Sequence, residues 1–301
     1  MPALLGIFLN VLAPVFLLVL LGYLVAPGLQ LEARTLSRFA YFILTPAFIF
    51  NTLSNTRIDA GLAGRMVGFI SLVYLGSILV AFVVARLLRR SAAMTAAYVM
   101  IAAFGNVGNF GLPIVQFALG PDALGVATVY FLANLVLAFV VCVAAANFSR
   151  GFSLGMAAQV LRTPALIALL PALAVNWSGF ALPPVVSRPV DLLADALIPV
   201  MLVVLGAQLA AAGVPRLSLD LLLASGIRLV SGPLIGFAIV GWFRLPELEA
   251  AVGILQASMP AAVLVSIIAM ENDLLPEFVT ATVLFSNLAS IVTLAIVLLV
   301  L

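Results

Sequence analysis

Two asparagines, Asn106 and Asn109, lie in the stretch FGNVGNFGLP, which starts at residue 104 and interrupts an apolar run. The three glycines of this stretch, beginning with Gly105, and its proline disfavour a regular helix. Amide side chains can satisfy the backbone groups freed in this way, or they can hold a ligand. The half-helix that starts near Gly111 directs its N-terminal dipole at the break, which favours an anion there. The alternative, close helix packing, explains the glycines but not the amides.

A second interruption lies in the apolar run from 249 to 271, where residues 256–260 read QASMP. Pro260 stands near the middle of this run. In lipid an unsatisfied backbone group costs several kcal/mol, so broken backbone survives only inside protein or beside a water-filled cavity. Paired, interrupted spans in two halves of a chain are typical of a transporter binding site. From the two interruptions we take these candidate substrate-binding residues: Gly105, Asn106, Asn109, Gln256, Ser258 and Pro260.

Arg228 lies about ten residues into the apolar run 218–243. An arginine at the centre of a spanning helix costs roughly 2.5–3.5 kcal/mol on insertion scales, so such residues usually serve function. Arg228 could attract or counterbalance an anionic substrate. It could equally be structural, hydrogen-bonded to freed carbonyls of a broken helix or extended toward the interface. The sequence leaves both interpretations open.

The sequence offers few residues that could couple transport to a proton or a sodium ion. No carboxylate lies clearly at mid-depth and the chain has no histidine, so an obvious proton carrier is missing. This favours potential-driven movement, since an inside-negative membrane drives export of a monovalent anion by about 2.3 kcal/mol per 100 mV. Sodium coupling is the alternative, with oxygen ligands from Gln256, Ser258, Ser286 and Asn287. Alternatively, Ser286 and Asn287 have only a structural role and form hydrogen bonds between helices. No cofactor is predicted.

The composition fixes the kind of element that must position these residues. The chain has 301 residues, of which 65% are hydrophobic and only 8% charged, whereas soluble domains carry roughly 25% charged residues. All thirteen basic residues are arginine, against eleven acids, and the net charge of +2 predicts no nucleic-acid partner. A membrane span needs about 20 mostly apolar residues. Ten candidate spans result: 4–26, 36–55, 64–88, 93–118, 123–147, 163–179, 189–212, 218–243, 249–271 and 276–301.

The arginines predict the orientation of these spans. The odd-numbered loops carry eight of them, and the even-numbered loops carry four. The positive-inside rule then places the odd loops in the cytoplasm and both termini outside. We expect a multi-pass protein of the cell (inner) membrane, with residues 148–162 as a cytoplasmic linker.

The chain repeats itself at an offset of 153 residues. Leu44-Thr45-Pro46 matches Leu197-Ile198-Pro199, and Asn134-Leu135 matches Asn287-Leu288. Each repeat would hold five spans, and because five is odd the second repeat enters the membrane from the opposite side. Such an inverted repeat is a hallmark of secondary transporters. We therefore predict an all-α integral membrane protein with repeats at 1–147 and 163–301.

The sequence resembles the auxin efflux carriers and their bacterial relatives, within the bile-acid and auxin transporter group. The residues that carry the resemblance are GNVGNFGLP from Gly105, ALGPDALG from Ala118, LTPAFIF from Leu44 and MPAAV from Met259. The similarity covers nearly the whole chain, and the first motif is the most specific. By contrast, Gly105 stands where the plant proteins have proline, and Ser71 to Val84 holds no charge, which disfavours auxin itself as the substrate.

The resemblance implies a scaffold of spans 1, 2, 6 and 7 and a mobile transport domain of spans 3–5 and 8–10. It implies that the broken fourth and ninth helices cross and hold substrate beside the crossover. Asn106 and Pro260 then match the crossover asparagine and proline of the family, and Asn134 matches a polar binding-site position of the fifth helix. It also implies small carboxylates as substrates and a homodimer formed through the scaffold.

Other classes of function fit less well. An ion channel would need a continuous pore, usually formed by a ring of subunits, and the two-fold repeat argues against it. An enzyme is not predicted, because the chain lacks histidine, lysine, a cysteine pair and a G-x-S-x-G motif. Nothing specific supports a receptor. The sequence therefore favours a secondary transporter of small organic anions that works by alternating access.

Overall fold

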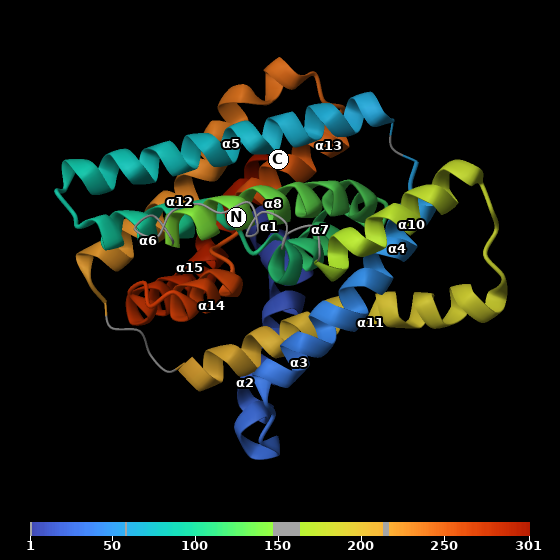
Figure 1. Cartoon of the computed structure of the whole chain (residues 1–301), viewed down its shortest axis with the longest axis horizontal. Helices are drawn as coiled ribbons and strands as arrows, with labels where there is room; N and C mark the ends of the chain where they lie inside the picture. Colours follow the sequence, from blue (N-terminus) through green and yellow to red (C-terminus); the bar gives the residue numbers. More distant parts are fainter. Residues whose placement is uncertain (1, 58, 147–162, 213–216) are drawn as a thin grey trace.

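The computed structural model describes residues 2–57, 59–146, 163–212 and 217–301. This part of the chain is a bundle of helices without strands (Figure 1). Seven helical segments in it are long and apolar enough to cross a membrane. They are Leu5–Leu29, Ala33–Asn55, Ala60–Leu87, Ala123–Cys142, Pro184–Ala211, Leu219–Phe243 and Pro276–Val300. The prediction of an all-helical membrane protein is confirmed to this extent.

The regions of the fourth, sixth and ninth predicted spans hold only shorter helices. The sixth region forms the 15-residue helix α10 (Pro164–Ser178). The fourth region divides into α6 (Ala92–Ala103), η3 (Val107–Gly111) and α7 (Leu112–Leu119). The ninth divides into α13 (Glu247–Ala257) and α14 (Val263–Glu271). Both interruptions expected from the glycines, amides and prolines are therefore present.

One group of helices contains the first, second, sixth and seventh segments. Its elements, besides α10, are α1 (Pro2–Ile7), η1 (Phe8–Leu12), α2 (Ala13–Leu29), α3 (Ala33–Phe39), η2 (Ala40–Leu44), α4 (Thr45–Asn55) and α11 (Pro184–Ala212). Helix α2 packs along α11, and α4 packs along α10. At the α2–α11 contact a Cβ on Gly22 or on Gly206 would overlap a backbone carbonyl of the other helix. Glycine is required there because the two backbones touch.

The second group surrounds the broken segments. It contains α5 (Ala60–Leu87), α8 (Ala123–Ala146), α12 (Leu219–Ile239), η4 (Val240–Phe243) and α15 (Pro276–Val300) together with α6, η3, α7, α13 and α14. Helix α5 packs on α6 and α12, α6 on α8, and α15 on α12 and α14. In Figure 1 most of this group lies above α2, α3 and α11. The two groups touch at few places, among them η3 against α11 and α7 against η1.

Local sequence signals explain where several of these helices begin. Asp59, Ser91 and Ser218 each accept a hydrogen bond from the backbone N–H three residues further on, as N-cap residues do. Proline stands in the first turn of α7, α10 and α15, where its missing N–H costs nothing.

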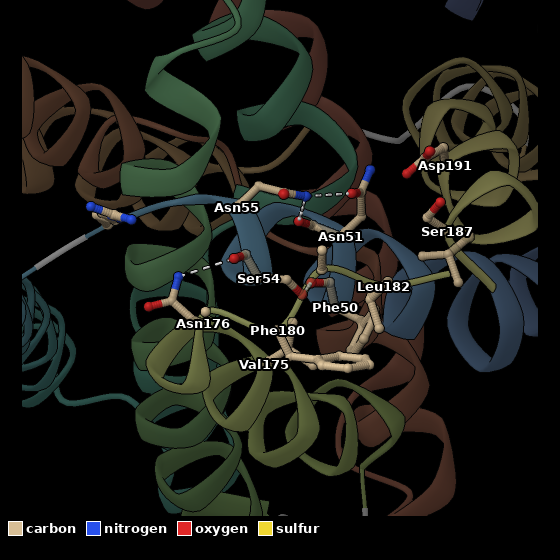
Figure 2. Close-up of a pocket in the computed structure, with 14 residues that line it drawn as sticks. Phe50, Asn51, Ser54, Asn55, Val175, Asn176, Phe180, Leu182, Ser187 and Asp191 are labelled. Atoms are coloured by element: carbon tan, nitrogen blue, oxygen red, sulfur yellow. Dashed lines mark hydrogen bonds between the residues drawn. The ribbon is translucent and has the colours of Figure 1, made fainter. Parts of the chain in front are cut away.

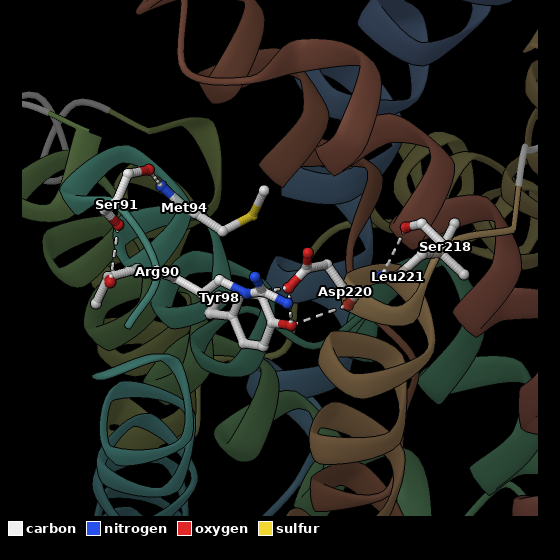
Figure 3. A network of polar contacts seen from close by, with 8 residues as sticks. Arg90, Ser91, Met94, Tyr98, Ser218, Asp220 and Leu221 are labelled. Carbon is white, nitrogen blue, oxygen red and sulfur yellow. Dashed lines mark hydrogen bonds and ion pairs between the residues drawn. The ribbon is translucent and has the colours of Figure 1, made fainter. Parts of the chain in front are cut away.

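A polar network ties the end of α5 to α6 and α12 (Figure 3). Nε of Arg90 lies 2.9 Å from Oδ1 of Asp220. The hydroxyl of Tyr98 donates to the same carboxylate oxygen at 2.8 Å. Charged groups lie at this end of the helices, whereas large apolar side chains such as Leu17 and Leu79 are exposed on the flanks. This distribution is the one expected of helices whose flanks face lipid.

Candidate functional site

The two broken segments pair with each other through their backbones. Gly105 and Ala261 form an antiparallel bridge. The N–H of Asn106 donates to the carbonyl of Pro260 at 2.7 Å, and the N–H of Ala262 donates to the carbonyl of Phe104 at 2.9 Å. Each interruption thus satisfies polar groups that the other has freed, which lipid could not do. We call residues 104–106 and 260–262 the crossover.

Two asparagines hold the outward-facing carbonyls of the bridge. Nδ2 of Asn134 on α8 lies 3.3 Å from the carbonyl oxygen of Gly105. Nδ2 of Asn287 on α15 lies 3.0 Å from the carbonyl oxygen of Ala261. These are the two asparagines that the offset of 153 residues makes equivalent, and both are buried. The sequence repeat therefore corresponds to a repeated contact in the structure.

The bridge is not fully symmetric. The hydroxyl of Ser286 accepts a hydrogen bond from the N–H of Ala261 at 3.2 Å. The offset places Ala133 at the corresponding position beside Gly105, and alanine has no hydroxyl. Among the described residues the N–H of Gly105 has no hydrogen-bond partner. One donor on the first-repeat side of the crossover is therefore left for a ligand or water.

Arg228 clamps the crossover from α12. Its Nε donates to the carbonyl of Met259 and its Nη1 to the carbonyl of Ala102, both at 2.8 Å. Nη2 lies 3.4 Å from the carbonyl oxygen of Ala257. The guanidinium also lies over the ring of Tyr74, 5.4 Å from its centroid. Three of its five N–H donors are thus used by the broken helices, and its charge sits beside them.

The clamp explains why residue 105 is glycine. A Cβ at Gly105 would overlap Nη2 of Arg228. Proline or alanine could not occupy this position while the guanidinium keeps its three carbonyls. A larger residue at this site would require the guanidinium to move from its present place.

Several buried polar atoms around the crossover have no partner among the described residues. They are Oδ1 of Asn134, both amide atoms of Gln256 and the hydroxyl of Tyr74. The side chain of Gln256 lies against the backbone of Gly111, where a Cβ would overlap its Oε1. Buried polar groups in proteins are nearly always hydrogen-bonded, so unpaired ones point to water or ligand. The donors and acceptors among them suit a hydrogen-bonding solute.

Three more of the predicted residues lie at or beside the crossover. Nδ2 of Asn106 lies 3.2 Å from Oδ1 of Asn287 and so links the two repeats. The carbonyl of Asn106 accepts from the N–H of Gly111 at 2.9 Å and starts η3. Asn109 is half-buried in η3. The Ser258 hydroxyl donates to the carbonyl of Ile254 within its own helix.

The groups suggested for sodium are largely used by the protein itself. Asn287 donates to Ala261 and to Val283 and accepts from Asn106. The hydroxyl of Ser286 donates to the carbonyl of Val283 and accepts from Ala261. Within the described ranges no group of three or more His, Cys, Asp or Glu side chains could hold a metal ion.

Sequence reasoning missed Tyr74 and the carbonyl oxygens that Arg228 holds. Tyr74 is buried in α5, within the uncharged run from Ser71 to Val84. A lone tyrosine in an apolar run was its only signal. It belongs beside Arg228 because α5 packs on α12, which the sequence does not specify.

A cavity of about 460 Å³ lies elsewhere, between the ends of α4, α10 and α11 (Figure 2). None of the crossover residues lines it. It is therefore separate from the site described above.

Comparison with known proteins assigns the chain to a family. The family model described as membrane transport protein matches it twice, over residues 7–151 and 150–298. The chain belongs to this family. The resemblance to the auxin efflux carrier group is confirmed, and the family model matches each half of the chain once. Members of this family are membrane transporters and not enzymes.

Three relatives of the membrane transport protein family are similar over almost their whole length. An "Uncharacterized transporter" of Methanothermobacter thermautotrophicus is 27% identical over 93% of this chain and 94% of its own. A "Putative malonate transporter" of Rhizobium meliloti is 28% identical over 93% of this chain and 91% of its own. A transporter of Methanocaldococcus jannaschii is 22% identical over 95% of this chain and 96% of its own.

Proposed function

We propose that this membrane transport protein is a secondary transporter of small organic anions, with carboxylates as the substrate class. The observation that carries the proposal is the crossover, where two broken helices leave buried polar groups without partners deep in an apolar bundle. The relative from Rhizobium meliloti, whose printed name refers to malonate, directs the first test to dicarboxylates.

In this proposal the substrate lies beside the crossover and completes its hydrogen bonds. The free N–H of Gly105 and Nε2 of Gln256 donate to carboxylate oxygens, and the N-terminus of η3 adds its dipole. The guanidinium of Arg228 supplies positive charge without leaving its carbonyls. Asn106, Asn109, Asn134, Ser258 and Pro260 shape the same site. Arg228 then has both roles that its sequence position allowed.

We also propose ten spans in two inverted repeats. Five helical segments per half, with the fourth interrupted in each, support this arrangement. The distribution of arginines supports both termini on the outside of the cell membrane. The homodimer stays a prediction from the resemblance.

Alternating access would follow from relative movement of the two groups of helices. The helices around α2 and α11 would act as the scaffold, and those around the crossover would carry the substrate. Contacts within each group are extensive and contacts between them are few, which supports movement as rigid units. Electrogenic export of the anion requires no further cofactor.

The test is counterflow in proteoliposomes. Vesicles containing purified protein are loaded with unlabelled malonate and supplied with labelled malonate outside. Saturable accumulation that competes with other small carboxylates, and that does not need sodium, is the expected result. A non-saturating conductance would instead indicate a channel, and no uptake of any small carboxylate in a folded preparation would refute the proposal.

A further inference from the structure

The 460 Å³ cavity is formed by the helices of the first group only. Its lining comes from the last turns of α4 and α10, the loop after each of them, and the first turns of α11. The residues are Phe50, Asn51, Ser54, Asn55, Arg57, Val175, Asn176, Gly179, Phe180, Ala181, Leu182, Ser187, Val190 and Asp191. Half of these fourteen side chains are polar or charged, although the helices that carry them are strongly apolar elsewhere.

A single amide holds the walls of the cavity together. Nδ2 of Asn176 on α10 lies within hydrogen-bond distance of three carbonyl oxygens at the end of α4, so one of its two hydrogens is shared: those of Leu53 at 2.9 Å, Ser54 at 3.2 Å and Thr56 at 2.9 Å. The ends of α4 and α10 therefore stay side by side. The cavity is a built feature of the fold and not a gap between independent loops.

The polar groups in the cavity carry opposite charges that are not paired with each other. Arg57 and Asp191 both line it, and the ion pair found among the described residues joins Arg90 to Asp220. Nδ2 of Asn55 donates to the carbonyl and to Oδ1 of Asn51. This leaves the amide donors of Asn51 and the amide oxygen of Asn55 available. Figure 2 shows Ser187 and Asp191 on one side of the cavity and Asn176 on the other.

The surface beside the cavity is suited to the boundary between lipid and water. Trp177 and Phe180 are 79% and 60% exposed, and aromatic side chains collect at that boundary. On α11 the side chains of Val185 and Leu192 are 80% and 73% exposed. The polar cavity is thus bordered by exposed apolar surface that acyl chains could cover.

We infer that this cavity binds the headgroup of a zwitterionic phospholipid, one that carries a phosphate and a primary ammonium. Arg57 and the amide donors of Asn51 would hold the phosphate, since guanidinium groups bind phosphate strongly. Asp191 and the amide oxygen of Asn55 would hold the ammonium. An anionic headgroup would leave Asp191 without a partner, and a soluble zwitterion would lack the contact with the apolar flank.

The experiment measures lipid binding to the purified full-length protein in detergent. Native mass spectrometry counts bound molecules when phosphatidylethanolamine or phosphatidylglycerol of the same acyl chains is added. We expect preferential retention of phosphatidylethanolamine. The substitutions Arg57→Gln and Asp191→Asn should each lower that retention by about threefold to tenfold, the effect of losing one charged contact.

Two matched controls lie on α11, the helix that carries Asp191. Arg188→Gln and Asp195→Asn remove the same charges from exposed positions of α11 that do not line the cavity, and retention should stay at the wild-type level. Equal loss in these controls, or equal binding of phosphatidylglycerol, would overturn the inference. Glycerophosphoethanolamine, which has the headgroup without acyl chains, tests the source of the ligand. If it displaces the lipid at equal concentration, the site takes a soluble zwitterion and the lipid assignment is wrong.

Discussion

Asn287 forms hydrogen bonds with buried polar groups that water would satisfy in a soluble protein. Its amide satisfies the carbonyls of Ala261 and Val283 and meets the amide of Asn106. The Val283 carbonyl also accepts from the hydroxyl of Ser286, but the buried carbonyl of Ala261 and the buried amide of Asn106 have no other partner among the described residues when the side chain is removed. The residue therefore stabilises the crossover before any substrate arrives.

We expect Asn287→Ala to destabilise the protein by about 1–3 kcal/mol, the cost of leaving a buried hydrogen-bonding group unpaired. Thermal unfolding in detergent measures this. Asn272→Ala is the control, because Asn272 makes a similar amide-to-carbonyl bond at the half-buried end of α14. Similar losses in both variants would contradict a special role for the buried asparagine.

Gly105 lies so close to Arg228 that one added methyl group should disturb the site. In the variant Gly105→Ala the new methyl group would displace Nη2 of Arg228. We expect transport to fall by at least about tenfold, as small displacements in a binding site commonly cause. Gly226→Ala on α12 is the matched control, since nothing lies within 4 Å of a Cβ there. Wild-type transport by Gly105→Ala would show that the guanidinium does not need its present place.

At the scale of elements, Arg228 connects three helices. From α12 it holds the carbonyl of Ala102 near the end of α6 and, at and just after the end of α13, the carbonyls of Ala257 and Met259. Carbonyls freed by an interruption in an apolar bundle need hydrogen-bond donors. A single guanidinium can supply donors to several of these carbonyls at once. The arginine is costly to insert, and its three contacts offset that cost.

The charge and the clamp can be separated by two substitutions. Arg228→Lys keeps the charge but cannot reach three carbonyls with a planar fork, whereas Arg228→Gln removes the charge. We expect both variants to unfold at lower temperature. We expect only Arg228→Gln to weaken binding of a carboxylate by about tenfold or more, measured at equilibrium on the folded fraction. Unchanged affinity in Arg228→Gln would restrict the residue to a structural role.

The whole molecule consists of two groups of helices with few contacts between them. One of these contacts is the edge-to-face pair of Phe16 on α2 and Phe110 in η3, whose ring centroids are 5.4 Å apart. Within the second group, Phe69 on α5 and Phe243 in η4 form a similar pair at 5.6 Å. If the groups move against each other during transport, only the first pair has to separate.

Cross-linking tests this movement. With Cys142 replaced by serine, cysteines at positions 16 and 110 should form a cross-link with a short bis-methanethiosulfonate, which joins the two thiols through reducible disulfides. We expect the cross-link to abolish counterflow and a reductant to restore it. The same reagent acting on cysteines at 69 and 243 should leave transport intact. Full transport by the protein cross-linked between 16 and 110 would refute rigid-body movement at this contact.

Hydropathy and helix-breaking residues were enough to predict where the helices run and where two of them break. Hydropathy, glycine and proline act over a few residues, so the interruptions near Asn106 and Pro260 could be predicted without neighbours. The repeat offset also identified Asn134 and Asn287 as equivalent before either had a known contact.

Which polar groups pair with each other could not be predicted, because it depends on how the helices pack. Freed backbone groups in lipid must find partners, but any nearby donor or acceptor would serve, and which one is nearby depends on helix packing. The structure pairs Gly105 with Ala261, gives Arg228 to the carbonyls of both broken helices and places Tyr74 beside it. The structure also brings the ends of α4, α10 and α11 together around a cavity. No local sequence pattern predicted this cavity, because its residues come from three distant parts of the chain.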